Sequence, residues 1–379
     1  MSLAPSDTLN QRHHQVREAL AQESADALLV TSIPNVAYLS NFDGSSAIVV
    51  LTPSRLAFIT DSRYVTSIEQ TVGTASECPG LELVRVKGAY DPTLVSVVTE
   101  LKPKRLAFEA AHLTVGRYQW LLKALSNEAQ GLELHPTTGL VEGVRVVKDD
   151  YELGVLREAG RRLSRAAECV FSDVRAGVTE RELALSIDIR IREAGFDRTA
   201  FETIVASGPN AALPHARPTE RKLDEGDLVV LDFGGVYHSY CVDLTRTVAV
   251  GPASPRSREV HAAVLAAHDR AVAAVAPGRS RFAIDQAARD RLAEAGMAEA
   301  FGHGTGHGLG LELHEDPRIA RQGPEVDGSR EFVTAGMVFT IEPGAYFPGW
   351  GGVRIEDDVA VTDGGVELLT DVTTELVEL

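Results

Sequence analysis

Residues 227–250, DLVVLDFGGVYHSYCVDLTRTVAV, read as a strand, a turn and a second strand. Four apolar residues lead into Asp232, and Asp243 follows eleven residues later. Because a hairpin folds its strands back on each other, it can bring these two carboxylates together. A carboxylate in so apolar a run is costly to bury without a partner. The stretch therefore predicts either ion pairs and turn caps, with Arg246 available to Asp243, or a shared cation.

Residues 337–361, MVFTIEPGAYFPGWGGVRIEDDVAV, repeat this form. An apolar run leads into Glu342, a Gly/Pro turn region follows, and Glu356 lies in the next apolar run. Four carboxylates in two matching hairpins favour a shared cation over separate ion pairs.

Residues 302–315, GHGTGHGLGLELHE, place three histidines on a glycine-rich backbone. Glycine disfavours a helix, so the spacing of His303 and His307 does not indicate a helical metal-binding pair. In an extended backbone, the glycines share one face, where another backbone or a ligand can approach closely, and these two histidines share the other. His314 has the opposite parity, so a bend or bulge is needed if all three converge. A glycine-rich loop with solvated histidines is the alternative.

Asp232, Asp243, Glu342, Glu356 and one histidine make an oxygen-rich set of ligands. Such a set suits Mn²⁺, Co²⁺, Fe²⁺ or Zn²⁺ better than a thiolate-lined zinc site would. Five ligands exceed the needs of one open catalytic zinc ion. Bridging carboxylates can hold two metal ions about 3.5–4 Å apart, and such a pair activates water and polarises the bond under attack.

Composition limits the possible partners and location. The chain has 379 residues, enough for two domains, and its net charge of −17 argues against a nucleic-acid or anionic-membrane partner. Three widely spaced cysteines indicate reduced thiols and a cytoplasmic protein. No run approaches the ~20 apolar residues of a membrane span, and the N-terminus lacks a signal-peptide core.

The chain changes character near residue 145. Before it, apolar β-type runs alternate with helical patterns, which is typical of an α/β domain with a helix-covered sheet. After it, helices are expected from about Asp150, after the capping box of Thr179 and Glu182 with a stop at Gly195, and over 255–275 and 280–295. Strand-rich runs lie between and after these helix pairs.

Five motifs occur in the order in which the Xaa-Pro peptidase family carries them: VASGPNAALPH, LDFGGVYHSYCVDLTRT, GHGTGHGLGLELHE, TIEPG and GGVRIED. Together with NVAYLSNFDGSS and FITDSRYV nearer the N-terminus, they resemble prolidase, aminopeptidase P and creatinase over nearly the whole chain. The resemblance implies a creatinase/prolidase-like α/β N-terminal domain, residues 1–145. It also implies an α+β catalytic domain of the pita-bread metallopeptidase fold, residues 146–379.

The resemblance also assigns residues to two divalent metal ions, with manganese expected and cobalt, zinc or iron as alternatives. The implied ligands are Asp232, Asp243, His307, Glu342 and Glu356. Glu342 would also accept the proton of the attacking water. The match to creatinase itself, a metal-free relative, is weakened because every ligand position is filled, and the same holds for non-catalytic binding relatives.

Substrate contacts follow from the same motifs. His215 matches a histidine on the substrate side, although a histidine in such a loop can simply be exposed. His314 matches one near the scissile carbonyl, and His303 one that lines the pocket. Arg354 matches an arginine that orients ligand carboxylates, with an ion pair to Asp358 as the alternative. Cys241 shares a strand face with Asp243 and has no assigned role.

Arg318 separates the activities within the family. It matches the prolidase arginine that receives the terminal carboxylate of a dipeptide, a contact that suits a guanidinium fork. A surface arginine paired with Asp316 or Glu315 is the alternative. The resemblance therefore implies an Xaa-Pro dipeptidase that acts on a proline-containing dipeptide or short peptide and is a homodimer, as relatives are. The composition adds the expectation of a cytoplasmic location. Aminopeptidase P activity on longer peptides is the alternative, followed by a non-catalytic binding protein on the same fold.

Overall fold

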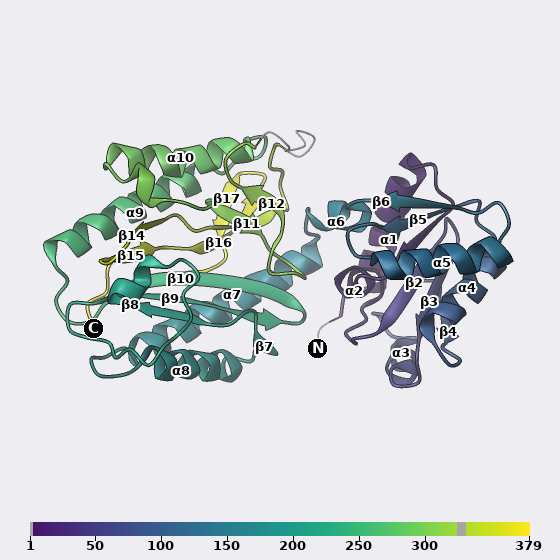
Figure 1. The fold of residues 1–379 in the computed structure, drawn as a ribbon, viewed down its shortest axis with the longest axis horizontal. Coiled ribbons are helices and arrows are strands. Elements are labelled where there is room, and N and C mark those ends of the chain that lie inside the picture. The colour runs from purple at the N-terminus through teal and green to yellow at the C-terminus, as the bar shows by residue number, and fades with distance from the viewer. Residues whose placement is uncertain (1–2, 324–330) are drawn as a thin grey trace. The chain divides into compact units, whose positions relative to one another are not determined.

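The computed structural model describes residues 3–323 and 331–379 (Figure 1). The chain divides into two compact units, Met1–Arg145 and Val146–Leu379. Of the helices in these described ranges, none is both long enough and apolar enough to cross a membrane.

A six-stranded sheet forms the centre of the first unit, in the order β4-β3-β2-β1-β5-β6. The sheet is mixed, since β2 runs antiparallel to both β1 and β3 whereas the other neighbouring pairs are parallel. Its strands are β1 (Ala27–Val30), β2 (Ala47–Leu51), β3 (Leu56–Thr60), β4 (Leu81–Arg85), β5 (Arg105–Glu109) and β6 (Glu133–Thr137). The first five coincide with the apolar runs of the sequence, whereas β6 is a partly exposed edge strand with a polar sequence, ELHPT.

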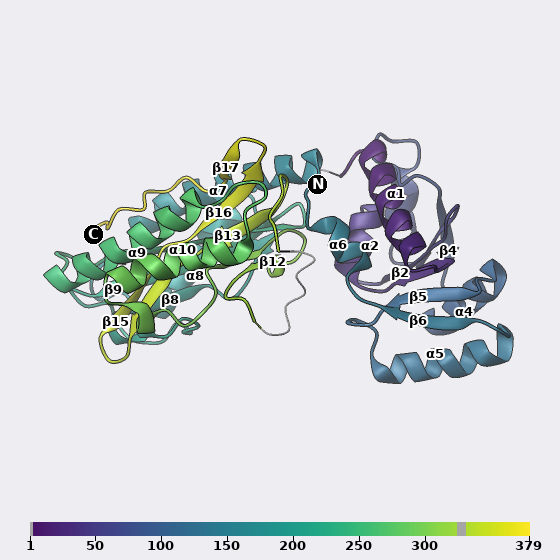
Figure 2. The same cartoon turned by 90° about the horizontal axis from the view of Figure 1, so that it is seen from above.

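Helices cover both faces of this sheet, with α1 on one face and α4 and α5 on the other (Figure 2). The helices of the unit are α1 (Ser6–Gln22), α2 (Ile33–Ser40), α3 (Val65–Thr71), α4 (Tyr90–Leu101), α5 (Val115–Glu128) and α6 (Leu140–Arg145). Buried side chains of β1, β2, β3 and β5 pack against those of α4 and α5 to form the core.

The second unit contains three sheets. One has the order β10-β9-β7, with β8 also paired to β9; the second has the order β12-β11-β13-β16-β17; and the third is the β14-β15 pair. The strands are β7 (Arg198–Thr199), β8 (Ile204–Ser207), β9 (Leu228–Tyr237), β10 (Tyr240–Ala249), β11 (Gly306–Gly308), β12 (Glu315–Ile319), β13 (Val338–Ile341), β14 (Gly344–Phe347), β15 (Gly351–Arg354), β16 (Asp357–Thr362) and β17 (Gly365–Leu368).

The four main helices of this unit lie where their sequence patterns place them. They are α7 (Asp150–Phe171), α8 (Glu180–Glu193), α9 (Pro255–Ala273) and α10 (Arg281–Glu294), with short 3₁₀ turns η1 (Gly208–Ala212) and η2 (Ala298–Ala300). The capping box of Thr179 and Glu182 is present, and Gly195 follows the end of α8 with a φ of +90°. These local signals succeed because caps and glycine stops depend on neighbouring residues only.

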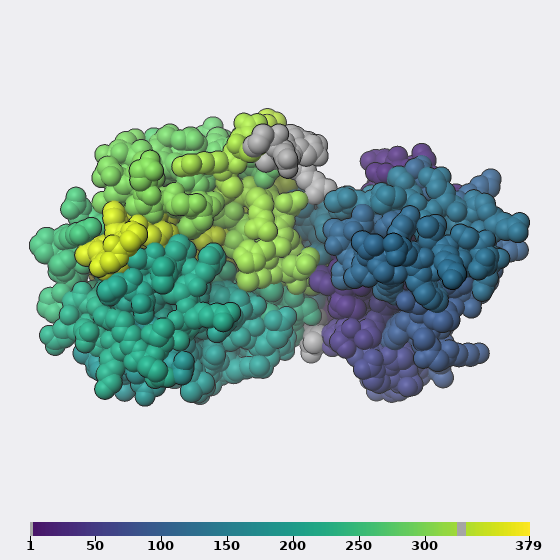
Figure 3. All heavy atoms as spheres, viewed as in Figure 1, coloured from purple at the N-terminus to yellow at the C-terminus, as the bar shows by residue number. Residues whose placement is uncertain are grey.

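The second unit is built from two similar halves. Helices α7 and α8 pack against β9 and β10, whereas α9 and α10 pack against strands of the later sheets. Figure 1 shows the strands between these two helix pairs, and Figure 3 shows the teal and green halves meeting with yellow C-terminal residues between them. A bridge between Thr245 of β10 and Glu356, which lies between β15 and β16, joins the halves at their centre.

Candidate active site

The β9–β10 hairpin brings Asp232 and Asp243 onto one face. Asp232 lies opposite Thr245, and Asp243 lies opposite Gly234. Residues opposite each other or two apart share a face of an antiparallel pair, so the two carboxylates are diagonal neighbours. The hairpin predicted from residues 227–250 is therefore confirmed.

The second pair of carboxylates lies at a break between two hairpins. Glu342 follows β13 directly and Glu356 precedes β16, while the residues between them form the β14–β15 hairpin. The Gly/Pro turn region expected here thus contains two short strands of its own, which the sequence did not indicate. Its glycines serve close packing, because a Cβ on Gly352 would lie 2.2 Å from the carbonyl oxygen of Ala211 in η1.

The alternating glycines let β11 fit between two other strands. A Cβ on Gly306 would lie 1.8 Å from the carbonyl oxygen of Thr340, and one on Gly308 would lie 2.2 Å from that of Asp316. The pairing of β11 with β12 shifts register between His307 and Gly308, which confirms the expected bulge. The alternative of a loop with solvated histidines is therefore wrong for His307, which is buried, and for His303, which is half-buried, whereas His314 is exposed.

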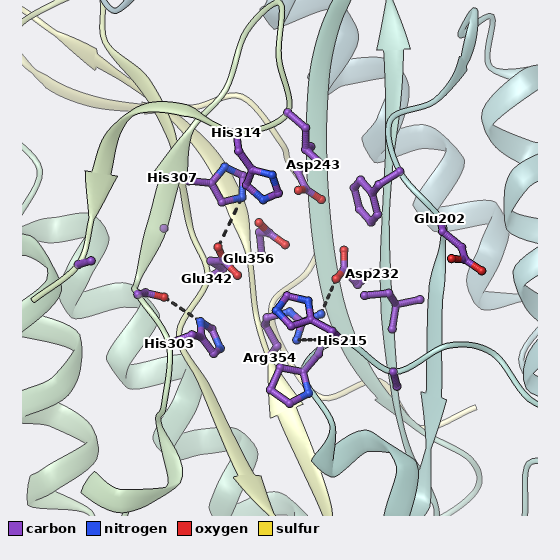
Figure 4. Close-up of a pocket in the computed structure, with 18 of the residues that line it drawn as sticks. Glu202, His215, Asp232, Asp243, His303, His307, His314, Glu342, Arg354 and Glu356 are labelled. Carbon is purple, nitrogen blue, oxygen red and sulfur yellow. Dashed lines mark hydrogen bonds and ion pairs between the residues drawn. The ribbon is translucent and has the colours of Figure 1, made fainter. Parts of the chain in front are cut away.

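A cavity of about 610 Å³ collects every residue that the sequence assigned to the site. Its wall includes His215, Asp232, Asp243, His303, His307, His314, Arg318, Glu342, Arg354 and Glu356. In Figure 4, the labelled carboxylates and histidines of this set point towards a common space, whereas Glu202 on the same wall points away from it. His215 and His314 are exposed at the cavity and the carboxylates lie deeper.

Three of the candidate ligands form a compact group. Asp243, His307 and Glu356 each offer a ligand atom, and these atoms lie within 4.8 Å of one another. The other two candidates lie beside this group. Asp232 is paired with Arg354, and a Glu342 oxygen lies 3.6 Å from Nε2 of His307 and 3.4 Å from the hydroxyl of Thr340.

The electrostatics of the group call for a cation. Burial and the neighbouring carboxylates hold the pKa of Asp243 and of Glu356 well above the usual range, and burial raises the pKa of Glu342 to about 7. Burial lowers the pKa of His307 to about 3, so its ring is neutral and able to act as a ligand. Ionised carboxylates around a neutral imidazole are a suitable donor set for divalent ions such as Mn²⁺, so the residues present fit such a centre.

Arg354 connects several parts of the cavity wall. Its guanidinium pairs with Asp232 and donates to the Tyr346 hydroxyl (2.9 Å), which in turn lies 2.8 Å from Nε2 of His303. The alternative ion pair with Asp358 is therefore wrong. Sequence reasoning missed Tyr346, because it lies in the glycine-rich stretch taken for a turn.

Arg246 does not form an ion pair with Asp243. It pairs instead with Asp357 at 2.7 Å, so the ion-pair interpretation of Asp243 was wrong. Side chains alternate between the two faces of a strand, so Arg246 and Asp243 of β10 point in opposite directions and cannot pair.

Arg318 is exposed at the cavity. Glu315, one of its two alternative partners, is paired with the buried Lys148 instead. Within residues 3–323 and 331–379, the guanidinium of Arg318 has no ion-pair partner. It is therefore available to a ligand.

His314 lies close to Arg318 in the sequence, and its ring stands edge-on to that of His307, with centroids 4.2 Å apart.

Cys241 is buried behind this region, and its backbone N–H donates to the carbonyl oxygen of Gly310. Burial raises the pKa of its thiol to about 12, so it stays protonated and unreactive at neutral pH. All three cysteines are free.

Comparison with known proteins identifies both units. Residues 154–363 match metallopeptidase family M24, and residues 12–147 match the creatinase/prolidase N-terminal domain. An Xaa-Pro dipeptidase of Pyrococcus horikoshii is 31% identical, over 98% of this chain and 100% of the relative.

Solved structures of related peptidases have the same fold as this chain. An Xaa-Pro dipeptidase from Bacillus anthracis superposes with a TM-score of 0.89 at 37% identity, covering 98% of this chain and 100% of that one. An X-Pro aminopeptidase from Thermotoga maritima reaches 0.85 at 32% identity, covering 97% and 99%. The resemblance noted in the sequence and the expected fold class are thereby confirmed. The chain belongs to metallopeptidase family M24 and is a peptidase with a creatinase/prolidase N-terminal domain.

Proposed function

We propose that the protein is an Xaa-Pro dipeptidase that works with two divalent metal ions, with Mn²⁺ as the expected metal. The observation that carries this proposal is the cavity itself, where four acidic side chains and a neutral histidine lie beside an arginine free to bind a carboxylate. The ligands would be Asp232, Asp243, His307, Glu342 and Glu356. Several relatives described as Xaa-Pro dipeptidases support the substrate class.

When bound, the two ions would supply Lewis acidity and an activated water. Glu342, whose carboxylate lies 3.6 Å from Nε2 of His307 in the cavity, would accept the proton of that water and pass it to the leaving proline nitrogen. Arg354 holds Asp232 in place. His215 and His314, both exposed at the cavity, would donate hydrogen bonds to the oxyanion that develops on the scissile carbonyl.

Arg318 would set the length of the substrate. Proline's own carboxylate lies just past the scissile bond of a dipeptide, where a guanidinium fork can bind it with two hydrogen bonds. His303, fixed by Tyr346, would line the same space. The alternative is an aminopeptidase P that takes longer peptides, as the description of the Thermotoga relative suggests.

We further propose a homodimer in a reducing, cytoplasmic setting. The free cysteines support the setting, because exposed thiols such as Cys169 are stable where disulfides do not form.

The direct test compares substrates on one enzyme preparation. Metal-free protein is loaded with Mn²⁺, Co²⁺ or Zn²⁺, and kcat/KM is measured for Xaa-Pro dipeptides and for Xaa-Pro-Yaa tripeptides. The proposal expects the dipeptides to be preferred, with Mn²⁺ giving the highest rate. A preference for tripeptides would establish the aminopeptidase P alternative. Metal ions bound without any hydrolysis would instead favour a binding protein.

Two histidines of the cavity should respond differently to replacement. His307→Ala should lower the number of metal ions bound, because His307 belongs to the compact group with Asp243 and Glu356. His314→Ala should keep the metal content and lower kcat by about 10²–10³-fold, the usual cost of an oxyanion donor. Elemental analysis and steady-state kinetics on both variants distinguish the roles, and the reverse pattern would mean that they are exchanged.

A further inference from the structure

Directly behind the proposed metal ligands lies a buried arginine. Asp243 of β10 lines the cavity and Thr245 shares its face of the strand, whereas the next residue, Arg246, faces the opposite side. Its side chain is only 3% exposed. It therefore lies behind the joint at which Thr245 and Glu356 bridge the two halves of the catalytic unit.

Arg246 uses every hydrogen-bond donor of its guanidinium. Nη1 donates to the backbone oxygens of Thr245 (2.9 Å) and Glu356 (2.5 Å). Nη2 donates to Asp357 and to the carbonyl of Val372, both at 2.7 Å, and Nε donates to the carbonyl of Thr373 at 2.9 Å. A guanidinium has five N–H groups, so none is left for another role.

Asp357, the charge partner of Arg246, is itself held from two sides. Its Oδ1 also accepts from the hydroxyl of Thr370 at 2.6 Å, and its Oδ2 lies 3.1 Å from Nε2 of His268 on α9. All these side chains are buried. The arginine is thus tied to a helix of the second half and to the C-terminal segment that lies between the halves (Figure 3).

These contacts act on a proposed metal ligand through its backbone. The N–H of Glu356 donates to Thr245 at 3.0 Å, and its carboxylate accepts from the Thr245 hydroxyl at 2.6 Å. Arg246 binds the carbonyls of both residues, so it fixes both sides of the bridge at once. Groups that orient metal ligands in this way commonly change metal affinity or activity by 10- to 100-fold when removed.

We propose that Arg246 is a positioning residue, which fixes the backbone at Glu356 from behind and thereby sets the affinity of the cavity for divalent metal. The inference rests on the proposed function, since it takes Glu356 as a metal ligand.

The test replaces Arg246 by Lys, which keeps the positive charge but offers three donors from one point instead of a planar fork. Binding of Mn²⁺ to the metal-free chain is measured by calorimetry, with kcat and KM after loading. We expect a dissociation constant weakened by about 10- to 100-fold and a kcat that falls more than KM changes. Arg246→Lys with the metal affinity of the unchanged protein would overturn the proposal.

A matched control is Arg221→Lys. Arg221 also pairs with a carboxylate, Asp227, and donates to the carbonyl of Lys222, but it contacts no proposed ligand. This control should lower the unfolding temperature without weakening Mn²⁺ binding. If Arg246→Lys does not fold, Asp357→Asn takes its place, because it loosens Arg246 without removing it. Weaker Mn²⁺ binding would then support the proposal, and unchanged binding would overturn it.

A second readout separates this inference from the proposed function. Amide hydrogen exchange in the metal-free chain reports whether the Glu356 N–H stays bonded to Thr245. Exchange there should speed up in Arg246→Lys and stay slow in Arg221→Lys. If the unchanged protein binds no metal, the proposed function fails, yet faster exchange at Glu356 would still establish that Arg246 positions this backbone.

Discussion

Replacing Asp243 by Asn, or Glu356 by Gln, is expected to remove nearly all peptidase activity from a chain that still folds. Each change exchanges a proposed oxygen ligand of the compact group for a neutral amide, which binds divalent ions poorly. A catalytic ion supplies several kcal/mol of transition-state stabilisation, so a loss of roughly 10³-fold or more in kcat is expected. Kinetics and elemental analysis on both variants measure this.

The same variants should leave the metal-free chain as stable as before, or more stable. A carboxyl with a raised pKa in the folded state stabilises the fold only below its ordinary pKa, and this contribution is lost as the pH rises. At neutral pH, ionising Asp243 and Glu356 therefore costs free energy in the metal-free fold, because both carboxyls are buried and lie beside other carboxylates. The amide carries no charge and avoids this cost, and a higher unfolding temperature of the metal-free variant would reveal the gain.

Glu180→Gln should have the opposite effect on stability, because the pKa of Glu180 is lowered and not raised. Burial alone would raise the pKa of Glu180, but hydrogen bonds from Thr219 and Ser207 outweigh it and hold the pKa below its usual value. This buried carboxylate stabilises the fold when ionised, so its amide variant should unfold at a lower temperature while binding two metal ions per chain.

Near-normal turnover and full metal content in Asp243→Asn would contradict the assignment of the ligands.

Arg318→Ala is expected to impair Xaa-Pro dipeptides far more than Xaa-Pro-Yaa tripeptides. A charge-assisted, two-bond contact to a carboxylate is worth roughly 1.5–3 kcal/mol, which corresponds to about a 10- to 150-fold loss in kcat/KM. In a tripeptide, a neutral amide takes the place of the proline carboxylate. The fall in kcat/KM for tripeptides should therefore be small.

Arg318 is exposed, and its removal breaks no ion pair among the residues that the structure describes. A change in activity can therefore be assigned to substrate binding and not to a disturbed fold. Arg318→Lys should recover only part of the dipeptide activity, since an ammonium gives a point charge instead of a fork. Equal losses on both substrates would show that Arg318 supports the cavity without reading the carboxylate.

Much of the site could be predicted because its residues stand in local patterns. Asp232 and Asp243 lie in one hairpin, whose two apolar strands and short turn indicate its fold directly. The glycines around His307 indicate that other backbones come close, and Thr340 and Asp316 are those neighbours. In each case, the spacing along the chain carries the geometry.

The contacts that sequence reasoning missed join segments that lie far apart. Arg246 meets Asp357, and Arg354 meets Asp232, across more than a hundred residues each. Choosing these partners over nearby Asp243 and Asp358 requires knowing how the two hairpins cross. Tyr346 was missed for a related reason, because glycines that allow close packing also look like turn signals.

We propose that this cavity hydrolyses an Xaa-Pro bond with the help of two metal ions. Titrating the metal-free chain with Mn²⁺ while measuring both the ions bound and the hydrolysis of an Xaa-Pro dipeptide tests it most directly. We expect hydrolysis to be absent without metal and to reach its maximum at two ions per chain. Full activity in the metal-free chain, or two tightly bound ions without any hydrolysis, would contradict it.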